Sequence, residues 1–184
     1  MTRSLAPCDS DALYASRLRE RLGTDAPSQL DLLGNTDLLI PPRTALFCSA
    51  RIPGNAILPA YDTVRRLRDS GVTVISGFQS PIEQECLRIL LRGKQPIIVC
   101  PARMITGMRI PTECRSAFEA GRLLFLSPFI TSPRRVTRDS ALRRNEMVAA
   151  LADEVFIAHD TPGGETTRMT DLLKQWGVPF LFPP

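Results

Sequence analysis

The feature that most constrains the fold is a regular alternation of short apolar runs and longer amphipathic stretches between residues 44 and 182. The apolar runs predict six strands, at 44–49, 72–76, 96–100, 122–127, 154–159 and 178–182. Helical periodicity between them predicts helices at 58–70, 81–92, 112–120, 138–152 and 165–176. Continuously apolar strands that alternate with helices are typical of a parallel sheet covered on both faces. We therefore expect an α/β domain with a doubly wound, mostly parallel sheet.

The chain has 184 residues, of which 43% are hydrophobic, enough for one buried core. We expect a Rossmann-like domain at 43–184, preceded by a lead-in at 1–42. The lead-in has a short amphipathic helix at 12–22 and then a loop-like stretch that ends at Pro41 and Pro42. The helix either covers the sheet or bridges a dimer. No run of about 18 apolar residues and no signal-peptide pattern occurs, so we expect a cytoplasmic protein with no membrane association.

The cysteines and the single histidine indicate no metal centre. The five cysteines show no CxxC pairing and no ligand spacing with His159, so we expect reduced thiols and no zinc site. No GxGxxG follows the first strand, which disfavours a dinucleotide cofactor. We expect no cofactor of any kind.

Ligands of such folds bind at the carboxyl ends of the strands, where two stretches stand out. Gly163 and Gly164 begin the helix at 165–176, with Thr166 after them; the pair either cradles a phosphate at the helix N-terminus or makes a tight turn. After the first strand, Ser49 offers a hydroxyl and Arg51 a cation that could clamp an anion. These residues predict an anion-binding edge.

The stretch SGFQSPIE follows the second strand. Ser80 and Glu83 fit a capping box, and we favour that structural role over direct ligand contact. Ser76 and Gly77 stand at the strand end, where the missing Cβ of glycine lets backbone or ligand come close.

The helix at 138–152 carries an amide on the stripe that faces the sheet. Asn145 is expected to hydrogen-bond either to nearby backbone or to a ligand in the cleft. Arg144, at the rim of that stripe, could reach a phosphate or a carboxylate such as Glu83.

Charge is unevenly distributed along the chain. The net charge is +4, yet residues 103–144 hold nine arginines against three acids. This segment is either a solvated face or a surface for polyphosphate or nucleic acid. The candidate nucleic-acid surface consists of Arg103, Arg109, Arg134, Arg135, Arg138 and Arg143.

Catalytic patterns are missing from the sequence: it has no GxSxG elbow, no Walker lysine, no HExxH and no convincing carboxylate pair. His159 is expected to pack or hydrogen-bond rather than to act as a base. Met169 and Trp176 follow helical spacing and are interpreted as core. We expect a protein that is not an enzyme.

Several motifs together resemble the DNA-processing protein A (DprA/Smf) family. They are ALFCSAR at 45–51, GVTVISGF at 71–78, LLFLSPF at 123–129, RRNEMVAALADEVFIAHD at 143–160 and GGETT at 163–167. The resemblance implies a Rossmann-like domain that binds single-stranded DNA, forms a homodimer and works with a RecA-type recombinase. It also implies a pocket at Arg51, Ser76, Gly77, Arg144, Asn145 and Gly164.

The chain departs from the family pattern at this pocket. Ser80 and Pro81 stand where the family has an arginine and a glycine, and Glu146 replaces a second arginine. The sequence also resembles the Lonely Guy phosphoribohydrolases, but Met169 stands where their catalytic glutamate would be. We therefore predict a non-catalytic nucleic-acid-binding protein for single-stranded DNA. The alternative is a protein that binds or hydrolyses a small nucleotide-derived ligand.

Overall fold

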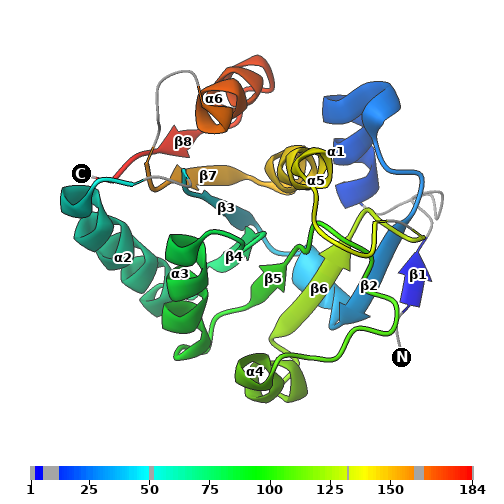
Figure 1. The fold of residues 1–184 in the computed structure, drawn as a ribbon, viewed down its shortest axis with the longest axis horizontal. Coiled ribbons are helices and arrows are strands. Elements are labelled where there is room, and N and C mark those ends of the chain that lie inside the picture. The colour runs from blue at the N-terminus through cyan, green and yellow to red at the C-terminus, as the bar shows by residue number, and fades with distance from the viewer. Residues whose placement is uncertain (1–2, 6–12, 50–51, 132, 160–163, 184) are drawn as a thin grey trace.

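The computed structural model describes residues 3–5, 13–49, 52–131, 133–159 and 164–183. These residues form one eight-stranded sheet with helices on both faces (Figure 1). Within them, no helix is long and apolar enough to cross a membrane.

The sheet has the strand order β1-β2-β6-β5-β4-β3-β7-β8. Its parallel part comprises β3 (Arg43–Phe47), β4 (Thr73–Ser76), β5 (Ile97–Val99), β6 (Leu123–Ser127), β7 (Glu154–Ile157) and β8 (Phe180–Leu181). Two N-terminal strands, β1 (Arg3–Leu5) and β2 (Leu30–Gly34), extend it in antiparallel pairing beside β6. Strand order reverses at β3, since successive strands run outward from it first through β4 and then through β7. The predicted doubly wound, mostly parallel sheet is confirmed.

Helices cover the two faces in two groups. On one face lie α2 (Gly54–Asp69), α3 (Pro81–Leu91) and α4 (Arg115–Glu119), which connect β3 through β6 in order. On the other lie α1 (Leu13–Leu22), α5 (Arg138–Leu151) and α6 (Glu165–Gln175), as Figure 1 shows. Three short 3-10 helices complete the chain: η1 (Gly23–Asp25), η2 (Thr36–Leu39) and η3 (Thr112–Cys114). The reversal at β3 places α5 and α6 opposite α2 and α3, because parallel crossovers are right-handed.

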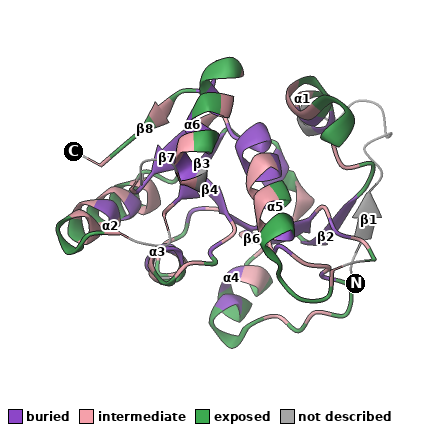
Figure 2. Ribbon diagram, turned by 45° about the horizontal axis from the view of Figure 1, so that its top comes forward, coloured by how far each residue is buried: buried purple, intermediate pink, exposed green. Residues whose placement is uncertain are grey.

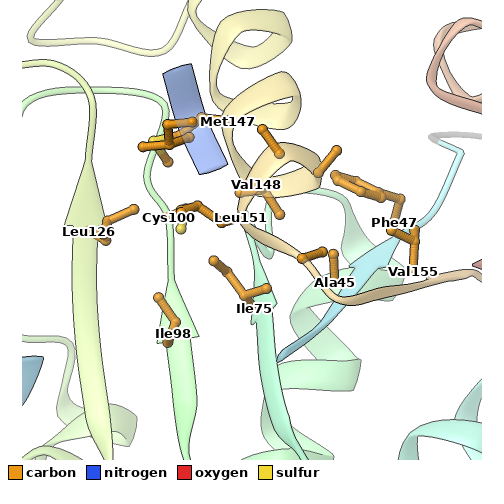
Figure 3. Packing of buried hydrophobic residues seen from close by; sticks show 14 of the residues in the cluster. Ala45, Phe47, Ile75, Ile98, Cys100, Leu126, Met147, Val148, Leu151 and Val155 are labelled. Carbon is orange, nitrogen blue, oxygen red and sulfur yellow. The ribbon is translucent and has the colours of Figure 1, made fainter. Parts of the chain in front are cut away.

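The sheet is buried on both faces. In β3, Ala45 and Phe47 pack beneath α5, whereas Leu46 packs on the side of α2 and α3. Figure 3 shows the first layer, in which Val148 and Leu151 of α5 meet side chains of the central strands. Figure 2 shows the central strands buried and the outer helix faces exposed. This accounts for the continuous apolar runs of the strands.

The predicted elements match the structure with small shifts, except near the N-terminus. Helix α2 begins at Gly54, four residues before the predicted start, with Pro59 inside it. The interpretation of the stretch after the first helix as loop-like is wrong, because it contains η1, β2 and η2. Leu30, Leu32 and Leu33 of β2 are buried, but the run is short and lies between turn-forming residues. The division at residue 42 stays a prediction.

Helix α1 covers the sheet, which was one of the two roles open to it. Leu18 belongs to the core cluster beneath α5. Arg21 Nη1 donates to the carbonyl oxygens of Ala150 at 2.9 Å and Ala152 at 2.7 Å, at the C-terminus of α5. Cations are favoured at that end of a helix, so α1 is fastened to α5.

Candidate functional site

A pocket of about 480 Å³ lies at the carboxyl end of β3, where the strand order reverses. It is enclosed by the end of β3, the turn between β4 and α3, the middle of α5 and the start of α6. Its lining residues are Phe47, Cys48, Ser49, Gln79, Ser80, Pro81, Glu83, Ala141, Arg144, Asn145, Gly164, Thr166 and Met169. This is the position at which doubly wound folds bind ligands.

The ends of β3 and β7 meet at the start of α6. The Ser49 amide donates to the carbonyl oxygen of His159 at 3.3 Å, and Ser49 Oγ lies 2.9 Å from Thr166 Oγ1. Gly164 is the N-cap of α6, and no side chain caps the helix there. The N-terminus of α6, where the helix dipole favours negative charge, thus stands at the pocket through Gly164 and Thr166. Arg51 and Gly163, predicted for the same site, lie outside the described residues.

Ser76 and Gly77 lie behind the pocket and do not line it. Ser76 Oγ donates to the carbonyl oxygen of Leu46 at 2.7 Å and accepts the Phe78 amide at 3.3 Å. A Cβ on Gly77 would lie 1.8 Å from Arg144 Nη1. The close approach expected at Gly77 is therefore made by a side chain of the protein itself.

Arg144 is an internal cation with 3% of its surface exposed. Its Nη1 donates to the Cys100 carbonyl oxygen at 2.6 Å, its Nη2 to Gln79 Oε1 at 2.9 Å and its Nε to Asn145 Oδ1 at 2.7 Å. Burial lowers the pKa of Arg144, and the negative charge of Glu83 opposes that shift. The guanidinium thus connects β5, the turn after β4 and α5, rather than projecting toward solvent.

Asn145 differs from the expectation of a backbone hydrogen bond. Its Oδ1 is held by Arg144, yet the residue also lines the pocket. The hydrogen-bond partner is a neighbouring side chain and not backbone. Gln79, which the sequence reasoning did not select, is held in the same way. Gln79 could have been selected from its position, which lies between the predicted strand end and the helix cap.

The capping box at the start of α3 is confirmed. Ser80 Oγ accepts the Glu83 amide at 3.2 Å, and Glu83 Oε2 accepts the Ser80 amide at 3.0 Å. The Glu83 carboxylate accepts two further amides, from Gln79 at 2.9 Å and from Cys48 at 3.1 Å. This carboxylate therefore fills a backbone N–H nest that could otherwise receive an anion. Both residues also line the pocket.

The candidate arginine surface lies at the same edge of the sheet as the pocket but outside it. Its members follow β5 and β6 or stand on the first turns of α5: Arg103 is half-buried, and Arg109, Arg134, Arg135, Arg138 and Arg143 are exposed. Two hydrogen bonds fasten the loops that carry them. Ser127 Oγ donates to the Arg103 carbonyl oxygen at 2.8 Å, and the Met104 amide donates to that of Pro133 at 3.0 Å.

Four further residues that the sequence analysis named can now be placed. Met169 is buried on the pocket wall, and Trp176 packs against the core, which confirms the core interpretation. His159 is half-buried at the end of β7 and lines a separate cavity with Asn55. Glu146, which stands where the family pattern has an arginine, forms an ion pair with Arg168 of α6. Its negative charge therefore has a partner on the next helix.

Two solved structures that resemble this one are DNA-processing proteins. DNA processing protein A from Helicobacter pylori matches with a TM-score of 0.76 and 20% identity, over 99% of this chain and 80% of that one. The protein of the same name from Streptococcus pneumoniae matches with a TM-score of 0.78 and 17% identity, over 98% of this chain. The present chain spans 62% of the Streptococcus pneumoniae protein. At these identities the two matches establish the fold.

The sequence itself settles the family. A search of curated proteins finds no match. The family model for DNA recombination-mediator protein A, in contrast, matches residues 7–167, which include every strand from β2 to β7 and the pocket lining except Met169. This chain therefore belongs to the DNA recombination-mediator protein A family.

Proposed function

We propose that this protein binds single-stranded DNA without cleaving it, at the carboxyl edge of its sheet. The observation that carries the proposal is the placement of exposed arginines at the same edge of the sheet as the pocket and the N-terminus of α6. Arginine side chains and free backbone N–H groups are the usual partners of phosphate oxygens. Family membership supports the proposal, as does the binding of single-stranded DNA by DNA processing protein A from Helicobacter pylori.

The exposed arginines and the pocket have different roles in this proposal. Arg144 is buried, and the negative charge of the neighbouring Glu83 offsets its positive charge. The pocket itself therefore offers little net attraction for a phosphate. The exposed arginines hold the backbone of the strand, and the pocket receives one nucleotide of it. Affinity then comes mainly from counterion release at the arginines and falls as salt rises.

Fluorescence anisotropy of a labelled single-stranded oligonucleotide, measured across salt concentrations, tests the proposal. Replacing both Arg134 and Arg135 by alanine should weaken binding and reduce the slope of log affinity against log salt by about 1.4, that is about 0.7 per phosphate contact. The matched control replaces Arg92 and Lys94, two exposed cations just after α3, at the opposite edge of the sheet. Equal slopes for both double variants, or no binding at low salt, would refute the proposal. An oligonucleotide shortened during incubation would refute its non-catalytic part.

A second candidate function is binding of a free nucleotide or a derivative of it. The pocket of about 480 Å³ favours it, because it stands apart from the arginine surface and has room for a small ligand. A thermal-shift panel separates the two candidates: stabilisation by one mononucleotide with no binding of oligonucleotide would favour the second.

We further propose that the protein acts as a homodimer with a RecA-type recombinase as its partner, as the family resemblance implies. Sedimentation at micromolar concentration tests the dimer. Loading of recombinase onto coated single strands, with and without this protein, tests the partnership. A monomer that leaves loading unchanged would contradict both.

A further inference from the structure

Two carboxamides of the pocket share one guanidinium. Arg144 Nη2 donates to Gln79 Oε1 at 2.9 Å, and Arg144 Nε donates to Asn145 Oδ1 at 2.7 Å. Gln79 belongs to the turn after β4 and Asn145 to α5, so the two amides flank the pocket from different elements. Arg144 is itself buried and cannot move away without losing these bonds and its bond to Cys100.

This contact fixes which end of each amide faces the arginine. Arginine has five N–H donors and no acceptor, so only the amide oxygens can face it. The NH₂ groups of Gln79 and Asn145 are therefore turned away from the guanidinium. In the described part of the chain, no acceptor hydrogen-bonds to either NH₂ group. Both groups remain donors for a ligand.

Other polar groups of the pocket are engaged within the protein. Ser49 Oγ and Thr166 Oγ1 lie 2.9 Å apart and hydrogen-bond to each other. Glu83, the one carboxylate among the described lining residues, already accepts three backbone amides and is 7% exposed. The apolar part of the wall includes Phe47, Pro81 and Met169, against which a ring can pack. The pocket thus combines an apolar wall with the amide donors of Gln79 and Asn145.

We propose that this pocket selects nucleobases with a carbonyl oxygen at position 4 of a pyrimidine or position 6 of a purine over those with an amino group at that position. Thymine, uracil and guanine carry carbonyl acceptors, whereas cytosine and adenine present an amino donor at the corresponding position. Against a donor, the NH₂ groups of Gln79 and Asn145 make no hydrogen bond, whereas a carbonyl oxygen at that place accepts one. The inference rests on the proposed binding of single-stranded DNA, and it names Gln79 and Asn145 as the residues that determine base preference.

Thymine and cytosine homopolymers of equal length are the sharpest probes. Both bases are pyrimidines, but thymine has a carbonyl oxygen at position 4 where cytosine has an amino group. We expect the thymine strand to bind wild-type protein about fivefold more tightly in fluorescence anisotropy, as one additional hydrogen bond implies. Gln79→Glu keeps an oxygen toward Arg144 but presents a second oxygen to the pocket in place of NH₂. This variant should bring the ratio of the two affinities to about one or invert it.

The control variant is Gln175→Glu, which makes the same charge change at the exposed C-terminal end of α6. It should leave the thymine-to-cytosine ratio unchanged. Thermal unfolding of Gln79→Glu verifies that the variant is folded. Equal affinity of wild-type protein for the two strands, or a ratio that Gln79→Glu does not alter, overturns the inference while leaving DNA binding intact.

A failure of DNA binding itself gives a different result from a failure of the base preference. If neither strand binds, single-stranded DNA binding fails, and thermal shift with thymidine and cytidine monophosphates tests the pocket by itself. Stronger stabilisation by thymidine monophosphate then supports the base preference, and equal stabilisation overturns it.

Discussion

Replacing Gly77 by alanine should destabilise the fold by displacing Arg144. The new Cβ would lie 1.8 Å from Nη1 and 2.0 Å from Cζ of that side chain, far inside van der Waals contact. Gly77 does not have a positive φ, so alanine meets no backbone strain there. The whole penalty therefore arises from the guanidinium, which must leave its position above Gly77.

The magnitude follows from the hydrogen bonds of Arg144. It makes three, to Cys100, Gln79 and Asn145, and a hydrogen bond to a charged group contributes about 1.5–3 kcal/mol. Loss of two of them at the lower end of that range costs about 3 kcal/mol. For a chain of this length the melting temperature should fall by about 6–12 °C.

A double-mutant cycle measured by urea denaturation tests this reasoning. Arg144→Ala should cost about 3–5 kcal/mol, since it leaves buried oxygens unpaired. In that background Gly77→Ala should cost nothing or stabilise by up to about 1 kcal/mol, because alanine narrows the unfolded ensemble. The control is Gly54→Ala, where a Cβ meets nothing within 4 Å. An equal cost of Gly77→Ala in both backgrounds would refute the proposed contact.

Two further predictions concern thiols and the N-terminal helix. Burial raises the pKa of Cys48, Cys86 and Cys100 to about 12 and that of Cys114 to about 11, so their thiolate fraction at pH 8 is about one in a thousand or less. In a Cys8→Ser variant, a thiol-specific reagent should label the native protein slowly at pH 8 and all four thiols rapidly in urea; rapid native labelling would contradict the burial. Asp153→Asn should destabilise by about 3 kcal/mol, because the carboxylate accepts from Arg17 at 2.7 Å and lies 3.6 Å from the buried Arg43. Urea denaturation gives this value, with Asp171→Asn on the exposed face of α6 as the control, and an equal effect of the two would contradict it.

Local physics made much of the fold predictable from the sequence. The strands from β3 to β7 are continuously apolar because both of their faces are covered, and that pattern is visible without a structure. The cap of α3 was predictable because it depends only on local contacts. Ser80 and Glu83 are three residues apart and bond within one helical turn. In contrast, β2 was missed, because its pairing partner β6 is about ninety residues away and supplies most of its stability.

The sequence by itself determined the α/β class, the edge of the sheet at which the pocket lies and the presence of Ser49, Asn145 and Thr166 there. Only the tertiary structure decided what Arg144 does. A guanidinium is equally suited to a phosphate and to a carbonyl oxygen, and its choice depends on which acceptor the fold brings within reach. Here Cys100, Gln79 and Asn145 converge on it from separate elements above Gly77, so the arginine orients the pocket from within instead of contacting solvent.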